Sequence, residues 1–261
     1  MGRTTLSRPP VVEESKTGPI CRVCGDAFGQ ILYLLMDKRL EQVRHAYNLT
    51  VEQHRRGVDS LKDVPENIKR SAFYLAFSSG QSHSNSASSD ILDYLKPRPS
   101  MRFLDVGCSA NLVNYRLDLW PSTYYGIDIS PALVQAVKSF AAARKLRLGG
   151  LYVAEAAKLP FKDRFFDIAA AIGVLEYCSL PYCRRALSEL AKVLKPESRV
   201  VIDIPNREHR HARDMARLES FLGRPIYLHI RSNFEIALKP FFSAESIDDS
   251  AAMIRYFLRL R

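Results

Sequence analysis

Long apolar runs are missing from this chain of 261 residues. The apolar run Ile168–Leu175 has eight residues, whereas a helix needs roughly 18 to cross a bilayer. The opening segment Met1–Pro10 lacks the apolar core of a secretory signal peptide. We therefore expect no membrane span, no export, and residence in the cytoplasm.

Cysteine is scarce, with five residues in the whole chain. Cys21 and Cys24 have the spacing of half a zinc knuckle, but no second Cys-x-x-Cys follows them. His45 and His54 do not fit the usual finger spacing either. The sequence therefore predicts reduced thiols and no bound metal, with Cys108 as a small packed side chain.

A concentrated basic segment is also missing, although the formal net charge is +10. Residues 1–70 hold 12 Lys and Arg against 9 Asp and Glu, residues 71–205 hold 16 against 12, and residues 206–261 hold 10 against 7. A nucleic-acid site usually gathers its positive charge on one face or one helix. Nucleic acid is therefore a less favoured partner than a small molecule.

Two apolar runs, each ending in a carboxylate or a glycine turn, form the most informative pattern. Arg102–Val106 is predicted to be a buried strand, and the turn at Gly107 leads into a helix that begins near Asn111. About twenty residues later a second predicted strand closes with Asp128, where nucleotide-binding folds offer a carboxylate to a ribose diol.

Four further segments follow in a fixed order. They are Glu155-Ala156 with the turn Leu159–Phe161, the strand Ile168–Leu175, the helix Leu187–Leu194 stopped by Lys195-Pro196, and the strand Arg199–Pro205. Across about Ser88–Pro205 the pattern resembles the class I, Rossmann-like methyltransferases that depend on S-adenosylmethionine. It is similar to their quinone and small-molecule group.

The resemblance implies an α/β fold with a mostly parallel, seven-stranded sheet that ends in an antiparallel hairpin, Ser243–Asp248 with Met253–Leu260. Before it we expect a flexible arm, 1–20, and a helical segment with a lid loop, 21–87, in which Gln81 and His83 are lid candidates. The methyltransferase domain is predicted to span 88–261, with a cap insertion at 206–232 that shapes substrate specificity.

Helices are predicted at Ile31–Tyr47, Ile68–Phe77, Ile91–Leu95, Met215–Leu222 and Phe234–Leu238. The apolar stripe of the first is expected to pack on the core or over the active site.

The resemblance also implies a cofactor site for S-adenosylmethionine. Asp105 and the backbone at Gly107 would face the methionine portion, and Ile172 and Gly173 would line the same end. Asp128 would accept hydrogen bonds from the ribose hydroxyls. Ile129 would cover adenine, and Glu155 with the Ala156 amide would bind the edge of adenine. Methyl transfer from a sulfonium needs alignment and exclusion of water, and it requires neither a metal nor a covalent residue. The predicted reaction is in-line transfer to a small-molecule acceptor.

A general base is needed where the acceptor arrives protonated. His209 is the first choice because it follows the fifth predicted strand and an imidazole has an ordinary pKa of roughly 6.5. His211, Glu176 and Tyr177 are the alternatives.

The chain departs from the family pattern at Ser109 and Asn111, where glycines are usual. Asparagine tolerates the left-handed region better than most residues, so Asn111 is expected to adopt a left-handed or capping conformation. Because of these two positions, a non-catalytic protein that binds S-adenosylmethionine stays open as an alternative.

Two other functions also stay open. A nicotinamide-dependent oxidoreductase shares the strand, turn and acid pattern, but it usually has a fuller G-x-G-x-x-G turn. Its short-chain class also pairs a tyrosine with a lysine four residues later, which the segment after Tyr182 lacks. An RNA or protein methyltransferase would keep the same core with a different acceptor.

Overall fold

The computed structural model describes residues 27–79, 85–108, 111–146 and 148–261. Its contacts divide the chain into two units, Met1–Leu35 and Met36–Arg261. The described part of the first unit is the beginning of helix α1, Ala27–Arg55, and every other described element lies in the second unit. The predictions made for the arm 1–20, Cys21, Cys24, Gln81, His83 and Ser109 lie outside the described residues.

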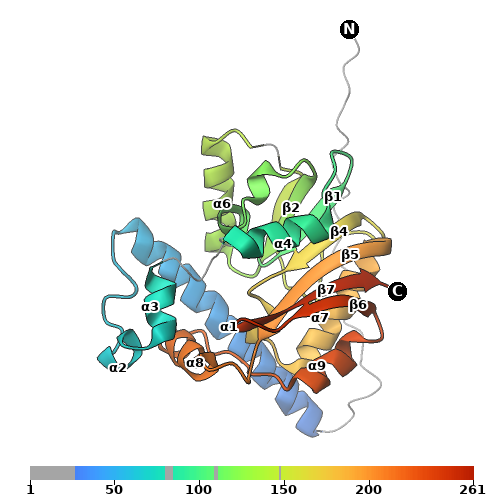
Figure 1. Ribbon diagram of the computed structural model, residues 1–261. Coiled ribbons are helices and arrows are strands. Elements are labelled where there is room, and N and C mark those ends of the chain that lie inside the picture. The colour runs from blue at the N-terminus through green and yellow to red at the C-terminus, as the bar shows by residue number, and fades with distance from the viewer. Residues whose placement is uncertain (1–26, 80–84, 109–110, 147) are drawn as a thin grey trace. The chain divides into compact units, whose positions relative to one another are not determined.

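The strands of the described residues form one seven-stranded sheet in the order β3-β2-β1-β4-β5-β7-β6 (Figure 1). They are β1 Arg102–Val106, β2 Thr123–Asp128, β3 Gly150–Val153, β4 Phe166–Ala171, β5 Leu194–Pro205, β6 Phe242–Asp248 and β7 Met253–Leu260. Strands β1 to β5 pair in parallel, whereas β7 lies antiparallel between β5 and β6. The predicted fold class, with its terminal hairpin, is confirmed.

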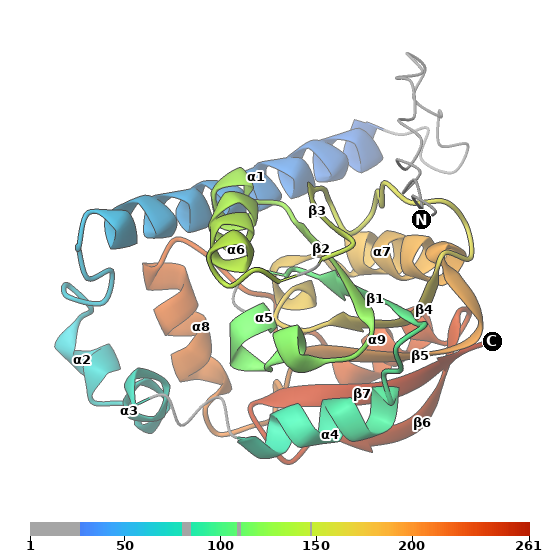
Figure 2. The ribbon, with the colours of Figure 1, turned by 90° about the horizontal axis from the view of Figure 1, so that it is seen from above.

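Helices cover both faces of the sheet because its central strands are apolar on both sides (Figure 2). In β1, Leu104 packs toward α7, Leu180–Val193, and α9, Arg231–Leu238. The preceding Phe103 packs toward α4, Asn85–Leu95, and α6, Pro131–Ala143. This alternation follows from the two-residue repeat of a strand. The buried strands therefore form a rigid base whose carboxyl ends can present side chains at one edge.

A smaller apolar cluster lies beside the sheet. Leu218 of α8, Ala212–Phe221, packs with Ile68 of α2, Glu66–Lys69, and with aromatic residues of α3, Ala72–Ser78. The predicted cap insertion thus contacts the helices that precede the sheet, all within the unit Met36–Arg261. The predicted boundary at residue 88 stays a prediction.

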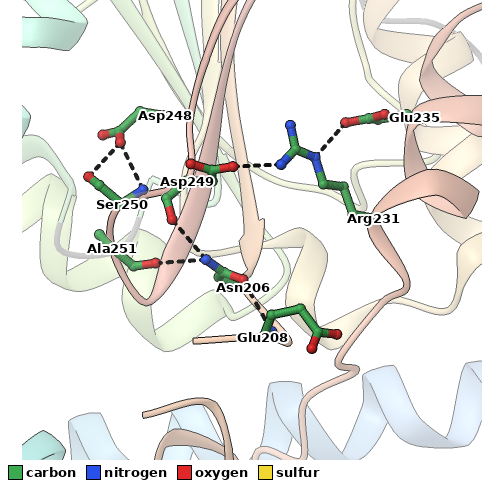
Figure 3. A network of polar contacts seen from close by, with 8 residues as sticks. All are labelled: Asn206, Glu208, Arg231, Glu235, Asp248, Asp249, Ser250 and Ala251. Carbon is green, nitrogen blue, oxygen red and sulfur yellow. Dashed lines mark hydrogen bonds and ion pairs between the residues drawn. The ribbon is translucent and has the colours of Figure 1, made fainter. Parts of the chain in front are cut away.

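Both ends of the segment after β5 are tied to the turn between β6 and β7 (Figure 3). The Asn206 side-chain amide donates to the carbonyl oxygens of Asp249, at 2.9 Å, and Ala251, at 3.3 Å. At the other end, Arg231 donates to the Asp249 carboxylate at 2.6 Å and to Glu235 at 2.8 Å. These bonds fix where the segment leaves the sheet and where it returns.

Several predicted helix and strand boundaries were wrong. The predicted strand Ile168–Leu175 is β4, which ends at Ala171, before the turn at Gly173 with its positive φ. The predicted helix Ile68–Phe77 is two helices, because Ser71 breaks it and its hydroxyl caps α3 by accepting from the Tyr74 amide at 3.1 Å. Helix α4 begins before the predicted start at Ile91. Strand β5 begins at Leu194, which pairs with Phe166, and a register shift separates this pair from the rest of the ladder.

The remaining short helices connect strands. They are α5, Asn111–Asn114, and the 3-10 helices η1, Leu117–Leu119, and η2, Leu175–Tyr177. Helix α5 follows β1 and η2 follows β4, so both begin close to the carboxyl edge of the sheet.

Candidate active site

A cavity of about 210 Å³ lies at the carboxyl ends of the parallel strands. Its walls come from residues at the ends of β1, β2, β3 and β4 or directly after them, and from α1. Open α/β sheets bind ligands at this edge because the loops there surround a crevice.

Seven of the eight predicted cofactor residues line this cavity. They are Gly107, Asp128, Ile129, Glu155, Ala156, Ile172 and Gly173. Their positions follow the strand order, with Glu155 after β3, Asp128 at the end of β2, Gly107 after β1 and Gly173 after β4. The fold therefore gathers residues that are up to 66 positions apart in the sequence.

Two glycines shape the backbone of the cavity wall. Gly107 has φ +77° and Gly173 has φ +71°, a region that side chains rarely adopt. A Cβ on Gly107 would also lie 2.1 Å from the Val174 Cγ2 atom. The amides of Gly107 and Cys108 both donate to the Ile127 carbonyl at 2.8 Å, which holds the turn against β2. Glycine is therefore required at position 107.

Asp105, the eighth predicted residue, is fully buried and does not line the cavity. Its carboxylate accepts from the Tyr124 hydroxyl at 2.7 Å and from the Asn111 amide at 3.4 Å. Burial raises the pKa of Asp105 to about 7, against the lowering effect of these two bonds, and nearby Asp128 raises it further. The structure thus places Asp105 in support of the turn.

Asn111 is the first residue of the α-helix α5. Of the two conformations expected for it, left-handed or capping, the left-handed one does not fit a residue within an α-helix. Its side-chain amide donates to the carbonyl oxygens of Gly107 and Ile172, each at 3.1 Å. Asn111 therefore joins the turn after β1 to the end of β4 through its side chain. The sequence did not predict this contact between the two strand ends.

Asp128 is held by a chain of hydrogen bonds that reaches α1. Its Oδ1 accepts from the Ser130 amide at 2.8 Å, and the Ser130 hydroxyl donates to Asn48 Oδ1 at 2.7 Å. The same hydroxyl caps α6 by accepting from the Leu133 amide at 3.1 Å. These bonds fix the orientation of a carboxylate that is only 6% exposed.

Helix α1 supplies a wall that sequence reasoning located only in general terms. Leu40, Val43 and Tyr47 line the cavity. Their helical spacing predicted a packed face, but spacing alone does not distinguish a core from a site.

A polar chain extends from α1 to the segment after β5. Tyr47 and Tyr177 are joined through their hydroxyls at 2.9 Å, and Tyr177 donates to Glu219 at 3.1 Å. Arg224 binds Glu219 with two nitrogens, at 2.9 and 3.0 Å, and lies over the Tyr47 ring at 4.7 Å. Burial raises the pKa of both tyrosines, so both phenols stay neutral at physiological pH.

Glu176 lines the cavity and is 7% exposed. Its Oε2 atom has no hydrogen-bond partner among the described residues. Burial raises the pKa of Glu176 well above the ordinary value, and the neighbouring Asp203 raises it further. Asp203 itself accepts from the Gly173 amide at 2.8 Å, and burial raises its pKa to about 6.

The structure places the first-choice base, His209, outside the cavity lining, together with His211. The two rings are 5.1 Å apart, and the His211 amide donates to His209 Nδ1 at 3.3 Å. Burial lowers the pKa of His209. The role of His209 stays a hypothesis, whereas the alternatives Glu176 and Tyr177 do line the cavity.

Within the described ranges, no group of three or more His, Cys, Asp or Glu residues could hold a metal ion. In the same part of the chain, no helix has the length and apolar character needed to span a membrane.

Residues 104–202 match the family model described as a methyltransferase domain. Over this part, the chain is similar to methyltransferase domains. The family resemblance expected from the motifs is therefore confirmed.

Two relatives are similar to parts of this chain. The sterol 4-C-methyltransferase strm-1 of Caenorhabditis elegans is 25% identical over 172 residues, covering 61% of the chain and 51% of the relative. The O-methyltransferase cnsE of Penicillium expansum is 36% identical over 111 residues, covering 41% and 39%. The chain thus spans about half of the first relative and less of the second.

A solved structure supports the fold of the methyltransferase domain. Magnesium protoporphyrin IX methyltransferase from Synechocystis PCC 6803, with bound SAH, has a TM-score of 0.59 at 15% identity. The superposition covers 84% of this chain and 98% of the other.

Proposed function

We propose that the chain binds S-adenosylmethionine in the cavity at the carboxyl edge and transfers its methyl group to a small-molecule acceptor. The observation that carries the proposal is the ordered row of groups along this edge, from Glu155 through Asp128 and Gly107 to Gly173. It combines a buried carboxylate with two glycines of positive φ, inside a methyltransferase domain.

The residues present fit this cofactor. Asp128, already oriented by Ser130, would accept the two ribose hydroxyls. Ile129 would cover adenine, and Glu155 with the Ala156 amide would bind its edge. Gly107, Ile172 and Gly173 would hold the methionine portion, with Asp105 supporting the turn from behind. The cofactor supplies a methyl group on a positively charged sulfur, and the lining carboxylates suit that charge.

Transfer of the methyl group requires alignment of acceptor, methyl and sulfur in one line, with water excluded. The base of the cavity is rigid because it is built from buried strand ends. Its α1 wall contains Leu40 and Val43, which exclude water and favour an acceptor with apolar surface.

A small molecule is the favoured acceptor, since both relatives described above are named for small-molecule or O-methyl transfer. RNA, protein and non-catalytic binding are the competing functions. Cytoplasmic residence stays a prediction from the sequence.

Titration calorimetry with S-adenosylmethionine, S-adenosylhomocysteine and NAD tests the proposal. We expect micromolar or tighter binding of the first two at one site per chain, and binding of NAD at least 100-fold weaker. Preference for NAD, or no binding of either adenosyl ligand by folded protein, would refute it.

A further inference from the structure

Glu176 is a buried carboxyl group that lines the cavity and has one oxygen atom without a hydrogen-bond partner among the described residues. It belongs to η2, directly after β4, and is 7% exposed. Its Oε2 lacks a partner among the described residues, whereas buried carboxyl oxygens are normally hydrogen-bonded. An unpaired carboxyl oxygen on a residue that lines a ligand cavity is available to a ligand once the side chain turns toward it.

Glu176 lies toward the end of the cavity that is remote from the proposed adenosine contacts. The strand order places Glu155 and Asp128 at β3 and β2, while Glu176 follows β4 on the other side of β1. A Cβ atom built on Gly173 would lie 3.7 Å from Glu176 Oε1, which puts Glu176 beside the proposed methionine end. The acceptor must approach the methyl group at that end.

The charge of the lining is one-sided. Asp128, Glu155 and Glu176 line the cavity, and none of its described lining residues is Lys, Arg or His. The nearest cation in the polar chain is Arg224, whose guanidinium is already bound by Glu219 through two nitrogens. A buried anion would therefore meet carboxylates without a compensating charge.

On the basis of the proposed function, we infer that Glu176 binds the methyl acceptor and takes its proton, and that the site selects acceptors with an uncharged hydroxyl group. The acceptor oxygen attacks the methyl carbon and forms an oxygen–carbon bond. The carbon–sulfur bond breaks, and its electron pair stays on sulfur, which becomes a neutral thioether. The hydroxyl proton passes to the Glu176 carboxylate and leaves later to solvent.

This acceptor class follows from the surroundings of Glu176. A carboxylate or phosphate acceptor would be repelled by the lining, for which no described residue provides a cation. A protonated amine would pair with Glu176, but its lone pair would then be occupied by the proton. An uncharged hydroxyl satisfies Oε2 as a donor and keeps a lone pair for the methyl carbon.

Several groups set the protonation of Glu176. Asp203 of β5 and Glu219 of α8 raise its pKa, as does burial, while Arg224 lowers it. It also faces the neutral groups Tyr47 of α1, Tyr177 of η2, Tyr115 after α5, and Cys178. A positive sulfonium placed beside Glu176 would lower its pKa and release its proton, which prepares the carboxylate as a base.

Proton release on ligand binding tests Glu176 without knowledge of the acceptor. S-Adenosylmethionine carries the sulfonium, whereas S-adenosylhomocysteine has a neutral thioether and is otherwise the same. Calorimetry at pH 7 in phosphate and in Tris, which differ in ionisation enthalpy, counts the protons released. We expect S-adenosylmethionine to release up to one proton more than S-adenosylhomocysteine, and this difference to disappear in Glu176→Gln.

Matched variants make the result decisive. The exposed control Glu66→Gln should keep the difference, and Glu176→Gln should keep its S-adenosylhomocysteine affinity within about threefold. Equal proton release in the wild type, or a difference that survives Glu176→Gln, would overturn the role of Glu176. Failure of the wild type to bind S-adenosylhomocysteine would instead overturn the proposed function.

The acceptor class is tested with methyl-labelled S-adenosylmethionine and a cellular small-molecule extract. We expect a neutral product that resists alkali and releases labelled methyl iodide in hydriodic acid, as a methyl ether does. Labelled methanol released by alkali, or a labelled product retained as a cation, would reveal a carboxylate or amine acceptor and overturn the inference. Label incorporation that is not reduced at least 100-fold by Glu176→Gln would overturn it as well.

Discussion

Replacing Asn111 should destabilise the turn after β1 and weaken ligand binding, because its amide joins two strand ends. Asn111→Ala removes the donor to the Gly107 and Ile172 carbonyls, both at 3.1 Å. A typical net contribution of about 1 kcal/mol per hydrogen bond gives a loss of about 2 kcal/mol in unfolding free energy. If about 1.4 kcal/mol of the ligand's binding free energy is then used to order the turn, the affinity for the ligand falls about tenfold.

The comparison of Asn111→Ala with Asn111→Gly distinguishes a side-chain role from a backbone role. Since Asn111 has helical geometry, glycine should cost up to about 1 kcal/mol more than alanine. A left-handed residue would show the opposite order, with glycine the least harmful replacement. Asn111→Val should resemble Asn111→Ala to within about 1 kcal/mol, since valine is tolerated in a helix.

Urea unfolding measures the first quantity, and calorimetric titration with S-adenosylhomocysteine measures the second. The matched control is Asn114→Ala at the exposed end of the same helix, where a change within about 0.5 kcal/mol is expected. An Asn111→Gly protein that is as stable as the wild type, or that binds better than Asn111→Ala, would refute the reasoning.

Three further predictions concern charged groups. Asp128→Asn should weaken S-adenosylhomocysteine binding at least about tenfold, because charge-assisted hydrogen bonds worth about 1.5–3 kcal/mol each become neutral ones. An unchanged affinity in calorimetry would exclude the ribose contact. Asp105 has a folded pKa of about 7, so its contribution to stability is fully present below its unfolded pKa of about 3.9 and is lost as pH rises through 7. Urea unfolding across pH 4–8 should therefore show a shallower decline of the unfolding free energy in Asp105→Asn than in the wild type. An unchanged pH profile would count against this role. Arg224→Met should lower the unfolding free energy by about 3 kcal/mol, since it leaves the nearly buried Glu219 without its ion-pair partner. Glu219→Gln in the same chain should recover part of this loss. No recovery in thermal unfolding would contradict the prediction.

The order of the fold could be predicted from the sequence because its signals are local. An apolar run such as Arg102–Val106 identifies a strand wherever it pairs, and Asp128 follows β2 as the motif predicts. Contacts between distant segments leave no such local signal. The bond between Ser130 and Asn48 joins residues 82 positions apart, and neither residue stands out in its own neighbourhood.

The errors at Asn111 and Ser71 have one cause. Propensity assigns a residue a backbone preference, whereas both residues act through a polar side-chain atom. Asn111 donates to carbonyls, one of which is 61 residues away, and Ser71 accepts from an amide three residues ahead. The Ser71 contact and the Asn111 bond to Gly107 both lie within a few residues, but only the Ser71 contact is a helix cap that capping rules could have found.

The choice between His209 and Glu176 as a base depends on position in the fold as well as on chemical type. His209 was preferred because the ordinary pKa of an imidazole is near neutrality, but His209 lies outside the cavity lining. The ordinary pKa of a glutamate is about 4.3, which makes it a weak base in water. Burial beside Asp203 raises that pKa, so a residue unsuited to proton abstraction by type becomes suited by position. The burial of Glu176 depends on η2, β5 and α1, which pack around one cavity. Glu176 therefore becomes a candidate only through the fold and its unpaired Oε2 atom. The short Val174–Tyr177 motif alone could not rank it above the histidines.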